Sequence, residues 1–303
     1  MKRYGITRLV LSAKQFIDLS QAEFESIREA KTNLVMALNV EEKLNLVLEN
    51  YAELEREMLG IAADHLLFQN HNWSSFVGEV HLISRRIVNL LSACRMYIDQ
   101  VKHEISSAYG PSSEASKELI AAFSHEYDSK FGYRVMESLR NYVQHRSLPV
   151  HSLVIESYAE DKGEGPGLAF CCVPKLHVDA IAKDETFKPA ILQELKDGDE
   201  HRDLRPLVRT YIEGIGNVHE KLRERMSTDV KHWEEIFSDV QKRFGAKYDG
   251  TQIGLAAVAI GEDDRTSESV QIFDDILAHR RELEAKNRML TKLHRRYVTN
   301  RAL

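Results

Sequence analysis

Three long stretches of the chain carry apolar residues at helical spacing, and this pattern constrains the fold more than any other feature. In residues 41–69, 75–106 and 203–244, an apolar residue returns at every third or fourth position, which places these side chains on one face of an α-helix. Only six prolines and fifteen glycines occur in 303 residues, so few positions interrupt such helices. We therefore expect a mainly α-helical protein. The apolar face predicted for residues 41–69 consists of Leu44, Val47, Leu48, Tyr51, Leu54, Met58, Ile61, Ala62 and Leu66.

Shorter helices are predicted at residues 20–38, 114–128 and 132–146. The first begins at Ser20 with the Ser-x-x-Glu pattern of a capping box, in which each side chain accepts a hydrogen bond from the other residue's backbone. The last should end before Pro149, because the residue that precedes a proline disfavours helical backbone. Short loops between amphipathic helices favour antiparallel packing, so these helices are expected to form a bundle.

The spacing of apolar residues changes after residue 150. Residues 151–159 and 167–174 have the composition of strands, and the glycine cluster at 163–167 between them predicts a hairpin. Residues 251–260 are predicted to form a buried strand or a short helix, and a helix is expected over 270–298. The predicted fold class is a mainly α, antiparallel helical bundle with a small β-hairpin or sheet insertion.

Charge is distributed unevenly along the chain. Residues 1–150 carry 17 Lys and Arg against 19 Asp and Glu, residues 151–203 carry 6 against 12, and residues 204–303 carry 18 against 16. We predict a helical bundle at 1–150, a β-hairpin and acidic connector at 151–202, and a region of long helices at 203–303. This last region either packs on the bundle or forms a domain of its own.

Composition argues against several classes of protein. No apolar run approaches the roughly 20 residues of a membrane span, and residues 1–19 lack the apolar core of a secretion signal. We therefore expect a cytoplasmic protein with no membrane partner. The formal net charge of −6 argues against a surface coated with basic residues for long nucleic acids. Cys94, Cys171 and Cys172 lack Cys-x-x-Cys spacing, so neither a structural metal nor another cofactor is expected.

The hexapeptide at residues 140–145 (RNYVQH) is the main candidate for chemistry. Its arginine can bind a phosphate, its histidine can transfer protons near neutral pH, and its asparagine can orient either group. At about 100° per residue, Asn141 and His145 fall nearly opposite the core face of the predicted helix, and Arg140 lies at the border. The pattern predicts an exposed catalytic set of Arg140, Asn141 and His145.

The spacing of arginine and histidine is a weak signal when taken alone. An arginine followed by four to six residues and then a histidine occurs four times, at Arg140–His145, Arg146–His151, Arg225–His232 and Arg288–His294. The first pair differs in having an asparagine directly after the arginine. It also lies at the end of a helix in a four-helix segment, immediately before the Leu148-Pro149 stop.

Residues 41–149 resemble the HEPN superfamily, a group of compact helical proteins of bacterial defence, toxin–antitoxin and RNA-processing systems. Many members carry an arginine followed by Asn, Asp or His, and then a histidine four to six residues after the arginine. Arg140, Asn141 and His145 match this motif position by position, and the resemblance covers roughly a third of the chain. It implies RNA cleavage without a metal, a role as a toxin or antiphage effector, and an antitoxin or defence-system protein as partner.

The resemblance also implies a homodimer in which two copies of the motif face each other across the interface. One His145 would take the proton of a ribose 2′-OH, and the other would protonate the leaving 5′-oxygen. Arg140 would stabilise the charge of the phosphorane, and Asn141 would orient His145 or the phosphate. The expected product is a 2′,3′-cyclic phosphate, and DNA should be inert because it lacks the 2′-OH.

Other basic residues are weaker candidates for contacts with RNA phosphates. Arg146 and His151 flank the hexapeptide, and a basic C-terminal run includes Arg288, Arg295 and Arg296. Arg146 is better explained as a cation at a helix C-terminus, whereas the run is equally well explained as a solvated helix face or a partner contact. The alternative function is a non-catalytic helical dimerisation or binding module whose polar helix face binds a partner.

Overall fold

The computed structural model describes residues 2–10, 15–68, 72–161, 166–183, 187–248, 253–288 and 290–296. The chain forms two compact units, and each is assembled from stretches that are far apart in the sequence. Unit 1 comprises Met1–Glu42, Glu104–Pro111 and Leu222–Arg288, and unit 2 comprises Lys43–His103, Ser112–Lys221 and Met289–Leu303. The boundaries expected after residues 150 and 202 both fall inside unit 2.

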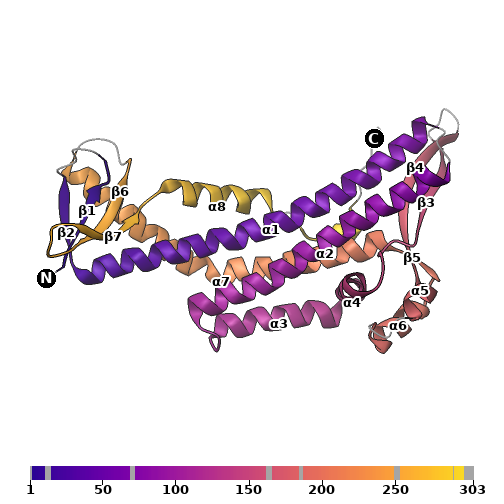
Figure 1. Cartoon of the computed structure of the whole chain (residues 1–303), viewed down its shortest axis with the longest axis horizontal. Helices are drawn as coiled ribbons and strands as arrows, with labels where there is room; N and C mark the ends of the chain where they lie inside the picture. Colours follow the sequence, from indigo (N-terminus) through magenta and orange to yellow (C-terminus); the bar gives the residue numbers. More distant parts are fainter. Residues whose placement is uncertain are drawn as a thin grey trace. The chain divides into compact units, whose positions relative to one another are not determined.

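Long helices dominate the described part of the chain, which confirms the prediction of a mainly helical protein. The longest are α1 (Gln21–Leu67), α2 (Trp73–Tyr109) and α7 (Leu204–Lys247), and each contributes residues to both units (Figure 1). The helices predicted at 20–38 and 41–69 are one continuous helix, because no glycine or proline lies between them to stop it. The helical spacing predicted Leu66 for the core, and this prediction is wrong, because Leu66 is exposed.

The capping box predicted at the start of α1 is present. The backbone nitrogen of Ser20 donates a hydrogen bond to Glu23 Oε2 at 2.7 Å, and the backbone nitrogen of Glu23 donates to Ser20 Oγ at 3.2 Å. These two bonds satisfy donors that the first turn of a helix otherwise leaves without a partner. The hydrogen bonds that the Glu23 carboxylate accepts from the backbone nitrogen and the hydroxyl of Ser20 lower its pKa, with a further contribution from Arg243. The start of the helix is therefore determined by local sequence.

Unit 1 contains a four-stranded antiparallel sheet with the strand order β2-β1-β6-β7 (Figure 1). Its strands are β1 (Arg3–Arg8), β2 (Phe16–Leu19), β6 (Leu255–Ile260) and β7 (Thr266–Gln271). Ile6 of β1 lies opposite Ala257 of β6, and both are fully buried. The described part of the strand predicted at 251–260 is thus confirmed as a buried strand, whereas the pairing of the chain's first strands with it was not predicted.

One glycine is required by close packing in this sheet. A Cβ atom on Gly5 would lie 2.1 Å from the ring of Phe16, which covers β1 from the neighbouring strand. The guanidinium carbon of Arg3 lies 4.3 Å from the centre of the same ring. A side chain at Gly5 would therefore displace Phe16, because the ring has no room to stay in place.

The helix predicted at 270–298 is shorter than expected. Residues at its predicted start belong to β7, and α8 (Asp274–Lys286) ends at Asn287, a buried C-cap residue. The chain continues into a short 3₁₀ helix, η1 (Leu293–Arg295), after Lys292 in a left-handed conformation with φ of 56°. Leu290 and Leu293 keep an apolar spacing, with Leu290 against Gly216 of α7 and Leu293 buried, but the left-handed backbone of Lys292 between them is incompatible with a continuous α-helix.

Unit 2 contains the helices that carry the predicted motif. Ser113 caps α3 (Glu114–Ser129) by accepting a hydrogen bond from the backbone nitrogen of Ser116 at 3.2 Å, and α4 (Phe131–His145) follows directly. Helices α4 and α7 pack closely at Gly214 of α7. A Cβ atom at this position would lie only 2.5 Å from the ring of Tyr133 on α4. The absence of a side chain at Gly214 allows this close packing. The packing places α4 firmly against the core of unit 2.

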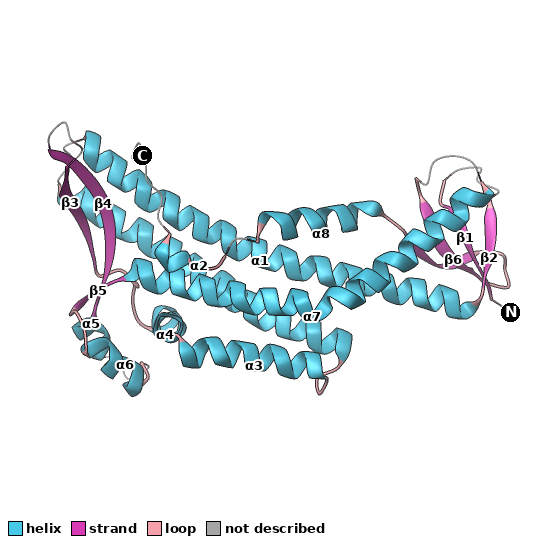
Figure 2. Cartoon of the chain, turned by 180° about the vertical axis from the view of Figure 1, so that it is seen from behind, coloured by secondary structure: helices cyan, strands magenta, loops and turns pink. Residues whose placement is uncertain are grey.

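A three-stranded antiparallel sheet completes unit 2, with the strand order β3-β4-β5 (Figure 2). The predicted hairpin is confirmed as β3 (Ser152–Asp161) and β4 (Pro166–His177). The third strand, β5 (His201–Asp203), was not predicted. It follows two short helices, α5 (Val178–Ala182) and α6 (Pro189–Lys196), which occupy the predicted acidic connector. Six residues separate the end of α4 from the start of β3. The start of β3 and the end of β4, which pair with each other, therefore lie near the hexapeptide.

Candidate active site

Helix α4 carries the predicted catalytic residues near its carboxyl end. Arg140 and Asn141 are half-buried, and His145 is exposed as the last residue of the helix. None of the three belongs to the core, as the helical geometry predicted. Val143 is only half-buried, although its spacing of four residues from Leu139 places it on the core face of α4. The buried residues of α4 are Gly132, Tyr133, Val135, Met136, Ser138, Leu139 and Tyr142.

Arg140 is held by two amide side chains on its own helix. Its Nη2 donates to Asn141 Oδ1 at 2.7 Å, and its Nη1 donates to Gln144 Oε1 at 3.2 Å. Asn141 therefore orients the arginine in this structure, and Gln144, which was not among the predicted site residues, does the same. A guanidinium carries five N–H donors, so three remain after these two bonds. One of them, on Nε, is buried and has no hydrogen-bond partner among the described residues.

The hydrogen-bond partners of Arg140 among the described residues are neutral side chains, unlike those of several other half-buried arginines of unit 2. Three of these bind carboxylates, in the pairs Arg134–Glu194, Arg205–Asp203 and Arg209–Glu55. Arg202 resembles Arg140 in this respect, because within the described part of the chain it binds neutral groups, the backbone carbonyls of Glu194 and Leu195. Among the described residues, no carboxylate lies within ion-pair distance of Arg140. Its positive charge is therefore oriented without being neutralised, which is the state that an anion-binding arginine requires.

His145 is the last residue of the same helix, five positions after Arg140. It is exposed, and among the described residues it has no hydrogen-bond or ion-pair partner. The ring can therefore reach a bound substrate and transfer a proton to or from it.

A row of three stacked histidines lies beyond Tyr142 of α4, and we call it the histidine row. It comprises His151 before β3, His177 at the end of β4 and His201 at the start of β5. The rings of His151 and His177 stack with centroids 5.4 Å apart, and those of His177 and His201 with centroids 4.0 Å apart. The antiparallel register places His177 opposite His201, which brings together residues that no sequence spacing connects.

Hydrogen bonds determine which ring nitrogen of His151 carries the proton. Its Nδ1 accepts a hydrogen bond from the backbone nitrogen of His177 at 3.2 Å, so this ring nitrogen carries no proton. The proton of the neutral ring is then on Nε2, which lies 3.5 Å from the hydroxyl of Tyr142. In the same row, His177 Nε2 lies 2.7 Å from Ser152 Oγ. His151 was a candidate contact for RNA, but both of its ring nitrogens face partners within the protein.

The surroundings of the histidine row favour neutral rings. Burial lowers the pKa of His151, and the neighbouring His177 lowers it further. Burial also lowers the pKa of His177, and His201 adds to this effect. Two stacked imidazolium rings would repel each other, so the row loses stability when it is protonated.

We expect unit 2 to lose stability when the pH falls below the ordinary histidine pKa of 6.5. The unfolded chain then binds protons that the folded histidine row excludes, so the free energy of unfolding decreases between 6.5 and the lower folded pKa values. Urea unfolding at a series of pH values measures this dependence. In His151→Asn, which keeps an acceptor for the His177 amide, the decrease should be smaller.

His232 provides the matched control for this experiment, because it is an exposed histidine on α7. The variant His232→Asn should keep the pH dependence of the wild type. If His151→Asn and His232→Asn gave the same pH dependence, the histidine row would not be its source.

The other basic residues that were predicted to contact RNA differ from Arg140 in their surroundings. Arg146 is an exposed C-cap residue of α4. In unit 1, Arg288 forms an ion pair with Glu284 at 3.0 Å. Arg295 and Arg296 are exposed and belong to unit 2, so the basic C-terminal run is divided between the two units. Its members therefore do not all share one compact unit with Arg140.

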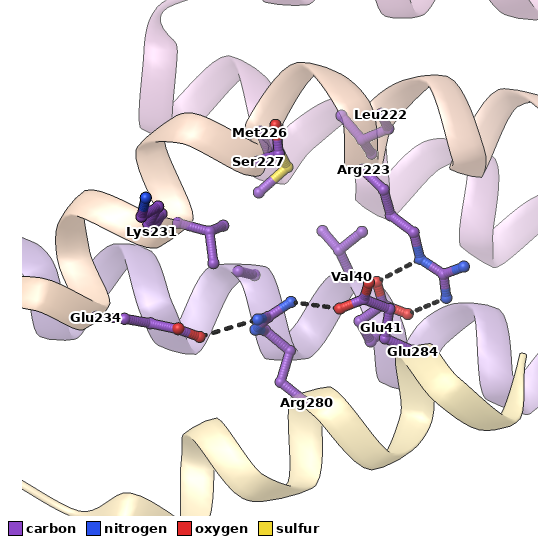
Figure 3. Close-up of a pocket in the computed structure, with 12 residues that line it drawn as sticks. Val40, Glu41, Leu222, Arg223, Met226, Ser227, Lys231, Glu234, Arg280 and Glu284 are labelled. Atoms are coloured by element: carbon purple, nitrogen blue, oxygen red, sulfur yellow. Dashed lines mark hydrogen bonds and ion pairs between the residues drawn. The ribbon is translucent and has the colours of Figure 1, made fainter. Parts of the chain in front are cut away.

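A separate cavity of about 230 Å³ lies in unit 1 between α1, α7 and α8 (Figure 3). Arg223 binds Glu41 at 2.6 Å, and Arg280 binds Glu234 at 2.9 Å and Glu284 at 3.1 Å. Figure 3 shows these carboxylates directed at the two guanidinium groups. Because both arginines are neutralised by glutamates, this cavity is a weaker candidate for binding anions than Arg140.

The cysteines have the surroundings of structural residues. Burial raises the pKa of Cys172 to about 12 and that of Cys94 well above its ordinary value, so neither forms a reactive thiolate at neutral pH. Among the described residues, no group of histidine, cysteine and acidic side chains is arranged to hold a metal ion. Within the same residues, no helix is both long enough and apolar enough to cross a bilayer.

Comparison with protein-family models, with curated proteins and with solved structures finds no match to this chain.

Proposed function

We propose that the protein is an RNA endonuclease that uses imidazole and guanidinium groups in place of a catalytic metal. The observation that carries this proposal is that the positive charge of Arg140 is oriented by neutral side chains. Its guanidinium is oriented by Asn141 and Gln144, has no carboxylate partner among the described residues, and lies on the same helix end as the exposed His145. Such a pair supplies both a phosphate ligand and a proton-transfer group.

The proposed chemistry is an internal transesterification. An imidazole takes the proton of the ribose 2′-OH, the 2′-oxygen forms a bond to phosphorus, and the bond between phosphorus and the 5′-oxygen breaks. A second imidazole returns a proton to the 5′-oxygen, which leaves as a hydroxyl group. Arg140 stabilises the additional negative charge on the pentacoordinate phosphorus. The products are a 2′,3′-cyclic phosphate and a 5′-hydroxyl, and the reaction consumes no metal or cofactor.

The need for two imidazoles favours a homodimer. Each chain offers one exposed histidine at the end of α4, and a two-fold axis near this helix end would bring a second His145 to the same phosphate. The HEPN resemblance of residues 41–149, which includes the helical-bundle arrangement, implies the same assembly. A role as a toxin or defence effector, with a partner protein that controls it, belongs to this proposal.

Incubation of the purified protein with a short RNA tests the proposal. We expect fragments that end in 2′,3′-cyclic phosphates, unchanged cleavage when a metal chelator is added, and no cleavage at a nucleotide whose 2′-OH is replaced by hydrogen. The variant Arg140→Ala, purified in parallel, controls for contaminating ribonucleases. Intact RNA, or identical fragments from wild type and Arg140→Ala, would contradict the proposal and favour a non-catalytic binding module.

A further inference from the structure

A serine and a histidine are hydrogen-bonded to each other on one face of the sheet of unit 2. The Oγ atom of Ser152 lies 2.7 Å from Nε2 of His177. Ser152 is the first residue of β3, and Lys175 of β4 lies directly opposite it. His177 follows Lys175 by two residues, so its side chain leaves the sheet on the same face. The two strands thus bring together a hydroxyl and an imidazole, the pair of groups that makes a serine nucleophilic.

The imidazole of His177 is flanked by a histidine on each side. It lies on β4, the central strand of the sheet, between His151 next to β3 and His201 on β5. The stacked rings have centroids 5.4 Å and 4.0 Å from that of His177. Rotation of the His177 ring away from Ser152 would break both stacks. The histidine row therefore orients this base, which is the task of the aspartate in a Ser-His-Asp triad.

His177 is able to act as a base at neutral pH, and solvent can reach it. Burial lowers its pKa, and His201 lowers the pKa further, so the ring is uncharged at pH 7. In the tautomer with its proton on Nδ1, the Nε2 atom can accept the proton of Ser152. Ser152 and His177 are both half-buried, and His201 beside them is exposed. A small substrate can therefore approach the pair from the edge of the sheet.

Lys175 adds a positive charge to the same face. Its Nζ atom lies 3.9 Å from Glu156 Oε1, which is at the outer limit of an ion pair. An ammonium held this loosely can turn toward an oxyanion that forms beside Ser152. A tetrahedral intermediate of acyl transfer carries one such negative charge, so the face suits an uncharged carboxylic ester.

We propose that Ser152 and His177 form a second catalytic pair, which hydrolyses a small carboxylic ester through an acyl-serine. His177 takes the proton of Ser152 while Oγ bonds to the carbonyl carbon. The bond between this carbon and the leaving oxygen then breaks, and the leaving alcohol takes the proton from His177. Water attacks the acyl-serine next and gives a proton to His177, which returns it to Ser152 as the carboxylic acid leaves. The proposal is independent of RNA cleavage, since it uses neither Arg140 nor His145.

A fluorophosphonate tests the nucleophile directly, because it reacts with activated serines and stays attached. The Oγ atom bonds to phosphorus as the phosphorus–fluorine bond breaks, and the proton and the fluoride pass to water. In the folded full-length protein we expect one adduct per chain, located on Ser152 by mass spectrometry of its peptides. The unlabelled protein should also hydrolyse p-nitrophenyl acetate, and the fluorophosphonate should stop this reaction.

Matched variants separate the roles of the residues. Ser152→Ala should abolish labelling and ester hydrolysis. His177→Gln keeps a polar side chain but loses the base, so labelling should slow by about 10²- to 10⁴-fold. Lys175→Met should slow ester hydrolysis by at least about tenfold. Ser157→Ala is the control, because Ser157 is an exposed serine of the same strand whose position places it on the opposite face, and its labelling rate should equal that of the wild type. Circular dichroism checks that each variant is folded.

Three results would overturn the proposal. The first is a wild-type protein that takes no label on Ser152, a result that does not depend on the folding of any variant. The second is equal labelling of the wild type and folded His177→Gln, which would show that the histidine does not activate the serine. The third is a protein that is labelled but does not hydrolyse the ester, which would leave the hydrogen bond between Ser152 and His177 as a structural contact.

Discussion

Replacing His145 with alanine should lower the rate of RNA cleavage by about 10²- to 10⁴-fold, the usual contribution of a side chain that transfers protons in the transition state. His145 is exposed and has no described partner, so its removal should leave the stability of unit 2 nearly unchanged. Single-turnover cleavage of a labelled RNA measures the rate, and thermal unfolding checks the fold.

A matched control for this experiment is His125→Ala. His125 is also an exposed histidine on a helix of unit 2, but it lies on α3 and outside the motif. Cleavage should continue at the wild-type rate in this variant. Equal loss of activity in both variants, or wild-type activity in His145→Ala, would exclude His145 as a catalytic residue.

Gln144→Ala tests the neighbouring contact. It removes the acceptor of the 3.2 Å hydrogen bond that Arg140 donates to Gln144. The shorter hydrogen bond, which Arg140 donates to Asn141, remains. We therefore expect a smaller loss of activity than in His145→Ala, expressed as weaker binding of RNA because the guanidinium is less well oriented. Its measurement is the concentration dependence of the same single-turnover rate.

Replacing Arg223 with alanine should destabilise unit 1 by about 3–5 kcal/mol, the cost of leaving a buried charge without its main partner. The carboxylate of Glu41 is only 4% exposed, and it accepts hydrogen bonds from Arg223 Nε at 2.8 Å and Nη2 at 2.6 Å (Figure 3). Removal of the guanidinium takes away both bonds while the carboxylate stays desolvated. Urea unfolding followed by circular dichroism measures the loss.

The control for this prediction is Arg243→Ala on the same helix. Arg243 pairs with Glu23 at 2.7 Å, but these side chains are 44% and 42% exposed, so water replaces the lost partner. The change should stay within about 1 kcal/mol. The double variant Glu41→Leu/Arg223→Met should recover much of the stability lost in Arg223→Ala, because it removes both buried charges. Equal effects of Arg223→Ala and Arg243→Ala would show that burial does not decide the strength of these ion pairs.

Much of the helical structure could be predicted because it depends on residues close together in the sequence. Apolar residues at helical spacing located α2, α3, α4 and α7 to within a few residues, and the capping box at Ser20 located the start of α1. The position of Arg140 and His145 on a non-core face of α4 follows from the same geometry. Each of these features is decided within one or two turns of helix.

The features that were not predicted depend on contacts between distant parts of the chain. The short strands β1 and β2 form a sheet only because β6 and β7, more than 200 residues away, supply pairing partners. His177 and His201 meet through the register of β4 and β5. Which of the described elements pack around α4 likewise decides that none of their carboxylates pairs with Arg140. A strand is stabilised by hydrogen bonds to neighbouring strands, and a charged side chain by the polar groups around it. Both kinds of neighbour come close only in the folded chain. Local spacing therefore determined the helices and the polar face of α4, whereas tertiary packing alone decided the sheets, the histidine row and the uncompensated charge of Arg140.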